Sequence, residues 1–105
     1  MVDIENINMH GRVSSVTHKQ SVPDGEEYEL QLINVPDPLL IKIVKEAKGK
    51  FVPSQSYDIF NADVGAYSSS NHQDTENEAM DEIIQNSLAM FDPNKPYSMA
   101  VNSDY

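Results

Sequence analysis

Two stretches in the first third of the chain carry the hydrophobic patterns of β-strands. Residues 7–19 are rich in Val, Thr and Ser and show no helical stripe, which favours a strand through Val13 and Val16. Gly11 inside this stretch indicates a β-bulge or a bend. Residues 21–26 contain Pro-Asp-Gly, a turn sequence that predicts the end of this strand.

The stretch after this turn predicts a second strand, antiparallel to the first. Apolar and polar side chains alternate over the first five of residues 28–35, as they do along a strand with one buried face. The residues expected on that buried face are Tyr28, Leu30 and Leu32.

Residues 37–50 fit either a helix or a strand, and periodicity does not separate the two. For a helix, Asp37 suits the N-cap, Pro38 the first helical position and Gly49 the C-terminal exit. The apolar stripe of that helix would be Leu40, Ile43, Val44 and Ala47. A strand is favoured by the β-branched residues Ile41, Ile43 and Val44, with Lys42 facing out.

The middle of the chain predicts a link, a strand and a polar loop. Residues 51–56 are turn-like, and residues 57–67 indicate one strand, or two strands broken near 61–63. Residues 68–73 are small and polar, which is typical of a linker or an exposed loop.

The clearest pattern in the chain is an amphipathic helix over residues 75–91. Thr75 and Glu78 form a capping box, and the Asp92–Pro93 dipeptide ends the element. Apolar side chains then recur at helical spacing, namely Met80, Ile83, Ile84, Leu88 and Phe91. Residues 92–105 are predicted to be a loop-like tail.

These elements predict a single small α+β domain. Residues 1–70 are expected to form a β-rich body, and residues 71–105 an acidic helix and tail. The body would be an antiparallel sheet or a partly open β-barrel, with the C-terminal amphipathic helix packed on it or extending from it. A helical 38–48 would change the order of elements to ββαβα.

Composition excludes several classes of protein. The chain has 105 residues and no cysteine, so it has neither disulfides nor thiolate metal sites, and we expect a cytoplasmic protein. No apolar run is long enough for a membrane helix, and the acidic N-terminus does not suggest a secretory signal.

Catalytic and metal-binding patterns are missing from the sequence. His10, His18 and His72 lie far apart, without metal-ligand spacing to a second soft donor. Residues 61–65 resemble part of a calcium loop but have no acidic residue at the twelfth loop position. The carboxylates of Asp58 and Asp63 have a spacing that is common by chance. We therefore expect no enzyme activity, no catalytic residue, no metal and no cofactor.

The negative charge is unevenly distributed. The chain has 7 Lys and Arg against 17 Asp and Glu, a formal net charge of −10. Residues 1–8 carry two acids and no base, residues 9–68 six bases and eight acids, and residues 69–105 one base and seven acids. The segments therefore carry −2, −2 and −6, so the body is nearly neutral and the last third is acidic.

The body combines cations with aromatic residues, as surfaces that bind single-stranded nucleic acid do. Lysines cluster between residues 42 and 50, immediately before several aromatic residues. The residues expected to bind nucleic acid are Arg12, Lys42, Lys45, Lys48, Lys50, Phe51, Tyr57, Phe60 and Tyr67.

This layout resembles small OB-fold single-stranded-DNA-binding proteins of phages and mobile elements, which join a five-stranded barrel to an acidic C-terminal region. The resembling features are Gly11-Arg12-Val13, residues 28–35, 40–44 and 51–67, and the terminal Asp104-Tyr105. The resemblance implies an OB-like barrel whose lysines track phosphates and whose aromatic residues stack on bases. It also implies that the acidic region competes for the basic groove or recruits partner proteins.

The alternative function is an acidic protein-interaction module or inhibitor that acts on a host protein, for instance by imitating nucleic acid. Carboxylates in the C-terminal region would contact that partner. The residues expected there, under either function, are Asp74, Glu76, Glu78, Asp81, Glu82, Asp104 and Tyr105. A third hypothesis is a homodimer whose seam is formed by Ile83, Ile84, Leu88 and Phe91.

Overall fold

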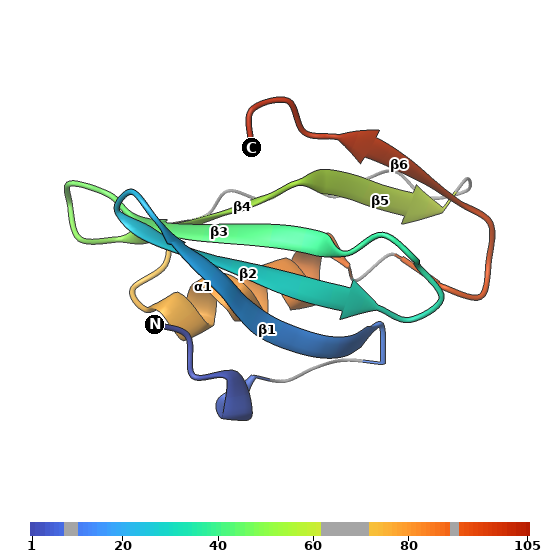
Figure 1. Cartoon of the computed structure of the whole chain (residues 1–105), viewed down its shortest axis with the longest axis horizontal. Helices are drawn as coiled ribbons and strands as arrows, with labels where there is room; N and C mark the ends of the chain where they lie inside the picture. Colours follow the sequence, from blue (N-terminus) through green and yellow to red (C-terminus); the bar gives the residue numbers. More distant parts are fainter. Residues whose placement is uncertain (8–10, 62–71, 89–90) are drawn as a thin grey trace.

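Four antiparallel strands form a meander at the centre of the molecule (Figure 1). The computed structural model describes residues 1–7, 11–61, 72–88 and 91–105. The strands run in the order β1 (Val13–Val22), β2 (Gly25–Leu32), β3 (Leu39–Lys45) and β4 (Phe51–Gln55). Within the described residues this sheet is open and does not close into a barrel. The protein is therefore a small α+β protein with an antiparallel sheet, as expected.

The β1–β2 hairpin confirms the antiparallel pair and the turn between its strands. Pro23 and Asp24 connect Val22 to Gly25, and Asp24 adopts a positive φ of 64°. A Cβ on Gly25 would lie 2.1 Å from the Ile43 carbonyl oxygen, so only glycine allows β3 to approach this closely.

The position of the bulge was predicted wrongly. Gly11 lies in a turn before β1, whereas the register shifts fall between Val13 and Ser15 and between His18 and Gln20. A bulge requires a strand partner on both sides of it, and the pairing of β1 with β2 begins only at Val13.

Residues 39–45 form a strand, which decides between the two alternatives for this segment. Leu39, Ile41 and Ile43 are fully buried on one face of β3, while Lys42 lies on the other face. Both edges of β3 are paired, with β2 and with β4. Burial of this alternating face and two hydrogen-bonded ladders therefore outweigh the local helix signals at both ends of the segment.

The expected link at residues 51–56 is instead strand β4. Its proline is tolerated because of the direction in which the nitrogen faces. The Phe51 N–H points away from β3 and donates to the Gln73 carbonyl oxygen at 2.8 Å. Pro53, two residues later, turns its nitrogen to that same outer side, so its missing N–H costs no bond to β3.

The tail expected to be loop-like contains a sixth strand. β5 (Tyr57–Asn61) pairs antiparallel with β6 (Tyr97–Val101) in a two-stranded ribbon that extends beyond the main sheet (Figure 1). This pairing joins the predicted body to the predicted tail. Residues 62–67 of the expected strand, and most of the expected 68–73 loop, lie outside the described residues.

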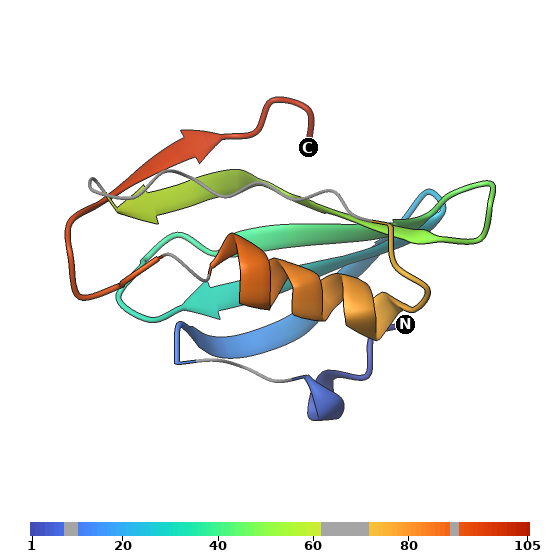
Figure 2. The same cartoon turned by 180° about the vertical axis from the view of Figure 1, so that it is seen from behind.

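A helix covers one face of the sheet (Figure 2). It consists of α1 (Glu76–Glu82) and a π-helical continuation, η2 (Ile83–Ser87). The predicted N-cap is confirmed, since Thr75 Oγ1 accepts a hydrogen bond from the Glu78 backbone N–H at 3.1 Å. The Glu78 carboxylate accepts a hydrogen bond from the Thr75 hydroxyl at 3.0 Å, so it contacts the side chain of the capping residue.

The apolar stripe of the helix lies in the core of this single chain. The helix expected over 75–91 is shorter than predicted, because the described helical residues end at Ser87 with Leu88 as the C-cap. Met80, Ile83, Ile84, Leu88 and Phe91 are all buried, as the amphipathic pattern predicted, although Phe91 follows the helix. Four of these residues were expected at a dimer seam, but each is at most 1% exposed. A seam through them would require the helix to leave the sheet.

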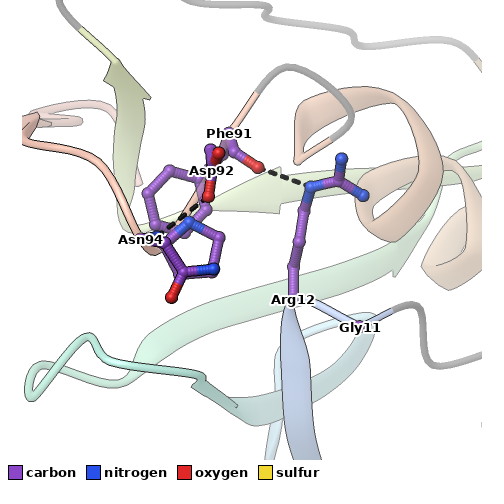
Figure 3. Close-up of a pocket in the computed structure, with 6 residues that line it drawn as sticks. Gly11, Arg12, Phe91, Asp92 and Asn94 are labelled. Carbon is purple, nitrogen blue, oxygen red and sulfur yellow. Dashed lines mark hydrogen bonds between the residues drawn. The ribbon is translucent and has the colours of Figure 1, made fainter.

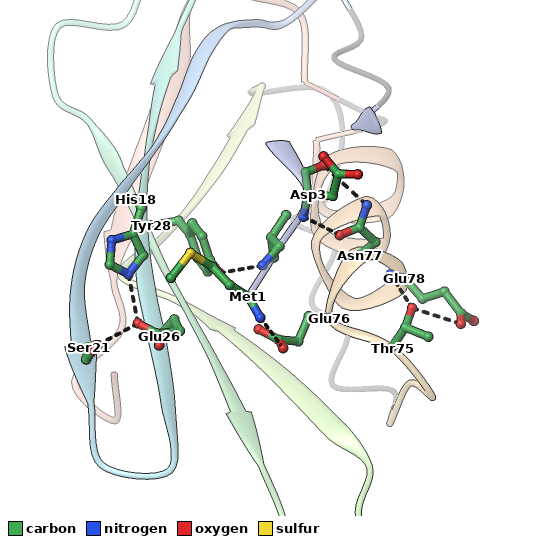
Figure 4. Close-up of polar contacts among 11 residues, drawn as sticks. Met1, Asp3, His18, Ser21, Glu26, Tyr28, Thr75, Glu76, Asn77 and Glu78 are labelled. Carbon is green, nitrogen blue, oxygen red and sulfur yellow. Dashed lines mark hydrogen bonds and ion pairs between the residues drawn. The ribbon is translucent and has the colours of Figure 1, made fainter. Parts of the chain in front are cut away.

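The N-terminal segment, which includes the short 3-10 helix η1 (Ile4–Asn6), joins the helix to the sheet (Figure 4). The Val2 N–H donates to the Tyr28 hydroxyl at 2.8 Å. The Met1 amino group pairs with Glu76 at 2.6 Å, and the Asp3 N–H donates to Asn77 Oδ1 at 2.7 Å.

None of the described helices has the length and apolar character that would be needed to cross a bilayer.

Candidate functional site

Three of the predicted lysines gather at the hairpin between β3 and β4. We call residues 45–51 the lysine hairpin. Lys45, Lys48 and Lys50 are exposed there, and the Lys45 Nζ lies 6.0 Å from the centroid of the Phe51 ring. The ring is half-buried against the core, so part of it stays accessible beside the cations.

Acidic residues surround the lysine hairpin. Lys50 forms an ion pair with Asp74, whose hydrogen bond and charge raise the pKa of Lys50. Glu46 Oε1 lies 2.9 Å from His72 Nδ1. A shallow depression of about 510 Å³ is lined by Glu46, Ala47, Lys48, Lys50 and His72. The cations therefore stand beside carboxylates and do not form a continuous positive surface.

The other residues predicted to bind nucleic acid do not join this cluster. Tyr57 is only 6% exposed and donates its hydroxyl hydrogen to the Asp37 carbonyl oxygen at 2.8 Å. Burial, together with the negative charge of Asp37, raises the pKa of Tyr57 to about 12. This ring is therefore part of the core and offers no face for stacking. Phe60 is half-buried on the β5–β6 ribbon, and Tyr67 lies outside the described residues.

Arg12 directly precedes β1, and the strand register places it at the opposite end of the sheet from the lysine hairpin. Figure 3 shows it next to the chain that follows the helix. Its Nε donates to the Phe91 carbonyl oxygen at 2.5 Å. The Asn94 N–H donates to Asp92 Oδ1 at 2.9 Å, and these residues line an open pocket of about 370 Å³. The Arg12 side chain thus joins the start of β1 to residues 91–94.

Three of the five acidic residues predicted around α1 line one groove. Glu78, Asp81 and Glu82 line a depression of about 240 Å³, which we call the acidic groove. The other residues that line it are Gln73, Gln85 and Asn86. The fourth acidic residue, Asp74, is exposed beside the groove and pairs with Lys50. The fifth, Glu76, points to the Met1 amino group.

The acidic groove combines carboxylates and carboxamides. Glu82 is 6% exposed and accepts a hydrogen bond from the Gln73 amide at 3.5 Å, which places this carboxylate at the floor of the groove. Glu78 is exposed and Asp81 half-buried at its rim. Carboxylate oxygens accept hydrogen bonds from guanidinium and ammonium groups, so this chemistry suits a cationic side chain.

The last two predicted partner-binding residues, Asp104 and Tyr105, lie elsewhere. Tyr105 donates its hydroxyl hydrogen to Glu27 Oε2, and its ring lies under Lys42, with Nζ 4.0 Å from the ring centroid. Asp104 is exposed. Tyr105 and Lys42 were assigned to different surfaces by the sequence, and Glu27 to none. Glu27 precedes the alternating stretch 28–35, so no sequence pattern marked it.

Among the described residues, no three His, Cys, Asp or Glu side chains are grouped so that they could hold a metal ion. No family model, curated protein or solved structure matches the chain.

Proposed function

We propose that the protein is a non-enzymatic interaction module that binds a basic segment of a partner protein through the acidic groove. The observation that carries this proposal is the composition of the groove, where three carboxylates and three carboxamides line one depression. None of the residues that line it is a lysine or an arginine. Among the described surfaces with predicted function, this one combines a concave shape with charge of a single sign.

The physical basis of the proposal is charge complementarity. The protein carries a net charge of −10, which steers cationic partners towards it, and the groove supplies local acceptors for their side chains. Glu78, Asp81 and Glu82 all lie within α1, and the first two, three positions apart, share one side of the helix. Such a row of negative charge can occupy a basic surface that otherwise holds phosphates. A nucleic-acid-binding protein is therefore the partner class we favour.

The test is a titration with an octa-arginine peptide at low salt, followed by backbone amide chemical shifts. We expect saturable shifts at Gln73, Glu78 and Gln85. The double variant Glu78→Gln/Asp81→Asn should bind about three to ten times more weakly, because each exposed ion pair contributes up to about 1 kcal/mol.

The matched control removes two exposed carboxylates elsewhere, in the variant Glu5→Gln/Asp37→Asn. It has the same net charge as the groove variant and should bind the peptide within about twofold of the unmodified protein. Equal weakening in both double variants would mean that only net charge attracts the peptide. That result, or an absence of saturable shifts, would contradict the proposal.

A second candidate is binding of single-stranded nucleic acid by the lysine hairpin. One observation favours it, which is that the lysine hairpin carries three exposed lysines, one of which, Lys45, lies over the half-buried ring of Phe51. This is the function implied by the resemblance to OB-fold proteins, and a partly open OB-like barrel is proposed with it. The neighbouring acids Glu46 and Asp74 make the surface nearly neutral, so binding should be weak.

This candidate is tested by fluorescence anisotropy of a labelled oligothymidine at low salt. The variant Lys45→Gln/Lys48→Gln should make the slope of log K against the logarithm of the salt concentration shallower. The expected change is roughly 0.7 for each phosphate contact that is lost. The variant Lys19→Gln/Lys95→Gln makes the same change of charge away from the hairpin and should have little effect. No binding of the oligonucleotide, or an equal loss in both variants, would exclude the lysine hairpin as the binding site.

A further inference from the structure

A row of four side chains crosses the face of the sheet opposite to α1. The strand register places Gln20, Glu27, Lys42 and Ser54 side by side on β1, β2, β3 and β4. Gln20 Nε2 donates to Glu27 Oε1 at 2.7 Å, which orients the carboxylate. Because register and alternation position these side chains, their arrangement is a property of the sheet.

Tyr105 occupies this row, and it is recognised in two ways. Its hydroxyl donates to the second oxygen of the Glu27 carboxylate, and its ring lies 4.0 Å below the Lys42 Nζ. The first contact requires a hydrogen-bond donor, which the phenol hydroxyl supplies, and the second requires an aromatic face. Glu27 is only 4% exposed beneath the ring. The site therefore has a buried acceptor and a cation that together select a tyrosine side chain.

Both partners of this hydrogen bond are in the right protonation state near neutral pH. Burial and the neighbouring Glu27 carboxylate raise the pKa of Tyr105, so the phenol keeps its proton. Burial also raises the pKa of Glu27, but hydrogen bonds from Tyr105 and Gln20 and the charges of Lys19 and Lys42 outweigh this effect. The pKa of Glu27 therefore lies below its ordinary value, and the group remains a carboxylate.

The segment that carries Tyr105 is held by few contacts. Asn102 donates its backbone N–H to the Ser56 carbonyl oxygen and its side-chain amide to the Gln55 carbonyl oxygen, both at 2.9 Å. Ser103 and Asp104 are exposed, and Figure 1 shows this tail turning back after β6. Because these contacts are few, releasing the tail requires less free energy than unfolding the sheet.

Release would also leave a favourable pair of charges behind. Glu27 and Lys42 are direct cross-strand partners, yet these two described residues form no ion pair with each other while Tyr105 lies between them. Opposite charges at such positions attract, so the empty site can close on itself. This attraction lowers the free energy that is needed to remove the tyrosine.

We propose that Gln20, Glu27 and Lys42 form a binding site for a phenol, which Tyr105 fills in cis and which a tyrosine side chain of another molecule can take when the 102–105 tail is released. This site lies on the face of the sheet away from the acidic groove and is independent of the function proposed above. An incoming tyrosine competes with Tyr105, whose tether gives it a high effective concentration. The tail thus acts as an internal competitor that raises the affinity required of any external ligand.

The experiment uses the full-length variant Tyr105→Ala, which empties the site, and the probe N-acetyl-tyrosinamide. Backbone amide spectra show directly whether the variant is folded. We expect saturable shifts at Gln20, Glu27 and Lys42 in the variant, and at least tenfold weaker binding in the unmodified protein. N-acetyl-phenylalaninamide, which lacks the hydroxyl, should bind several times more weakly than the tyrosine probe.

Two substitutions in the Tyr105→Ala background separate the site from its surroundings. Adding Lys42→Gln should weaken binding of the probe several-fold, whereas adding Lys45→Gln on the same strand should leave it unchanged. The proposal is overturned if the probe causes no saturable shifts in folded Tyr105→Ala, or if it binds the unmodified protein equally well. Equal effects of the two lysine substitutions would overturn it as well.

Discussion

The two faces of the four-stranded sheet are covered by different parts of the chain. On one face, α1 and η2 bury a layer of apolar side chains, including Leu30, Ile41 and Met80. On the other face, Tyr105 lies over a row of polar side chains. The same strands supply both faces, because successive residues alternate between them.

This difference separates two kinds of contact. The helix-covered face gains stability from the burial of large apolar side chains, and no external ligand replaces that contact easily. The tail-covered face is held by a hydrogen bond, a cation–π contact and two bonds from Asn102. Contacts of this kind are specific and individually small, which suits a surface that exchanges its occupant.

The largest effect should come from Ile41→Ala, compared with Leu40→Ala next to it. Ile41 is fully buried under the helix, whereas Leu40 is half-buried on the other face. We expect a loss of about 3–4 kcal/mol in the free energy of unfolding for Ile41→Ala and about 1 kcal/mol for Leu40→Ala. Equilibrium denaturation in urea measures both losses. Equal losses would show that the two faces are packed equally tightly.

A buried polar group on the core side should have the next largest effect. Tyr57→Phe leaves the Asp37 carbonyl without its partner and should cost about 1–1.5 kcal/mol at neutral pH. The pKa of Tyr57 rises from 10.0 to about 12 in the folded protein, so the unfolded chain releases this proton first as the pH increases. The stability linked to Tyr57 is therefore present below pH 10 and is lost between pH 10 and about 12.

Denaturation curves recorded across this pH range test the assignment. The Tyr57→Phe variant should lose stability less steeply above pH 10, by up to about 1.4 kcal/mol per pH unit. An unchanged slope would mean that Tyr57 does not control the alkaline unfolding.

The cap of the covering helix should contribute less. Thr75→Ala removes the acceptor for the Glu78 N–H at the start of α1 and should cost about 1 kcal/mol. Ser103→Ala, at an exposed position in the tail, serves as the control and should change stability by no more than about 0.5 kcal/mol. Thermal denaturation compares the two variants, and equal stabilities would argue against the cap.

The smallest effect is expected on the tail-covered face. Tyr105→Phe removes the hydrogen bond to Glu27 and keeps the ring, so it should cost about 0.5 kcal/mol. Tyr105→Ala should also increase the rate at which an amine-reactive reagent modifies Lys42. Mass spectrometry measures this rate against the rate for Lys45. A loss of stability as large as that of Ile41→Ala would place the tail in the core and remove the difference between the two faces.

Local signals in the sequence predicted the elements that local interactions form. The Pro23–Asp24 turn and the Thr75 cap depend on neighbours within a few residues, and both are present as expected. The strand β4 was missed because Pro53 indicates a turn unless it is known to lie at an edge. The strand β6 was missed because four of its five residues are exposed, so it shows no alternation to detect.

The candidate site was predictable only where its residues are adjacent in the sequence. The lysines of residues 45–50 share one hairpin, and the carboxylates of residues 74–82 share the start of one helix. Lys42 was grouped with the lysine hairpin, but it lies on the outer face of β3. There its Nζ contacts the ring of Tyr105, which is 63 positions later in the sequence. Contacts over such separations depend on the return of the chain through β5 and β6.

By itself the sequence determined the hairpin, the capped helix with its buried stripe, and the acidic character of the last third of the chain. Each of these follows from periodicity, turn chemistry or charge within one segment. The tertiary structure decided that residues 39–45 form a strand, that Tyr57 is buried and that Tyr105 covers Glu27. These outcomes depend on which distant segments pair and cover one another, because burial and the pairing of backbone groups outweigh local preference.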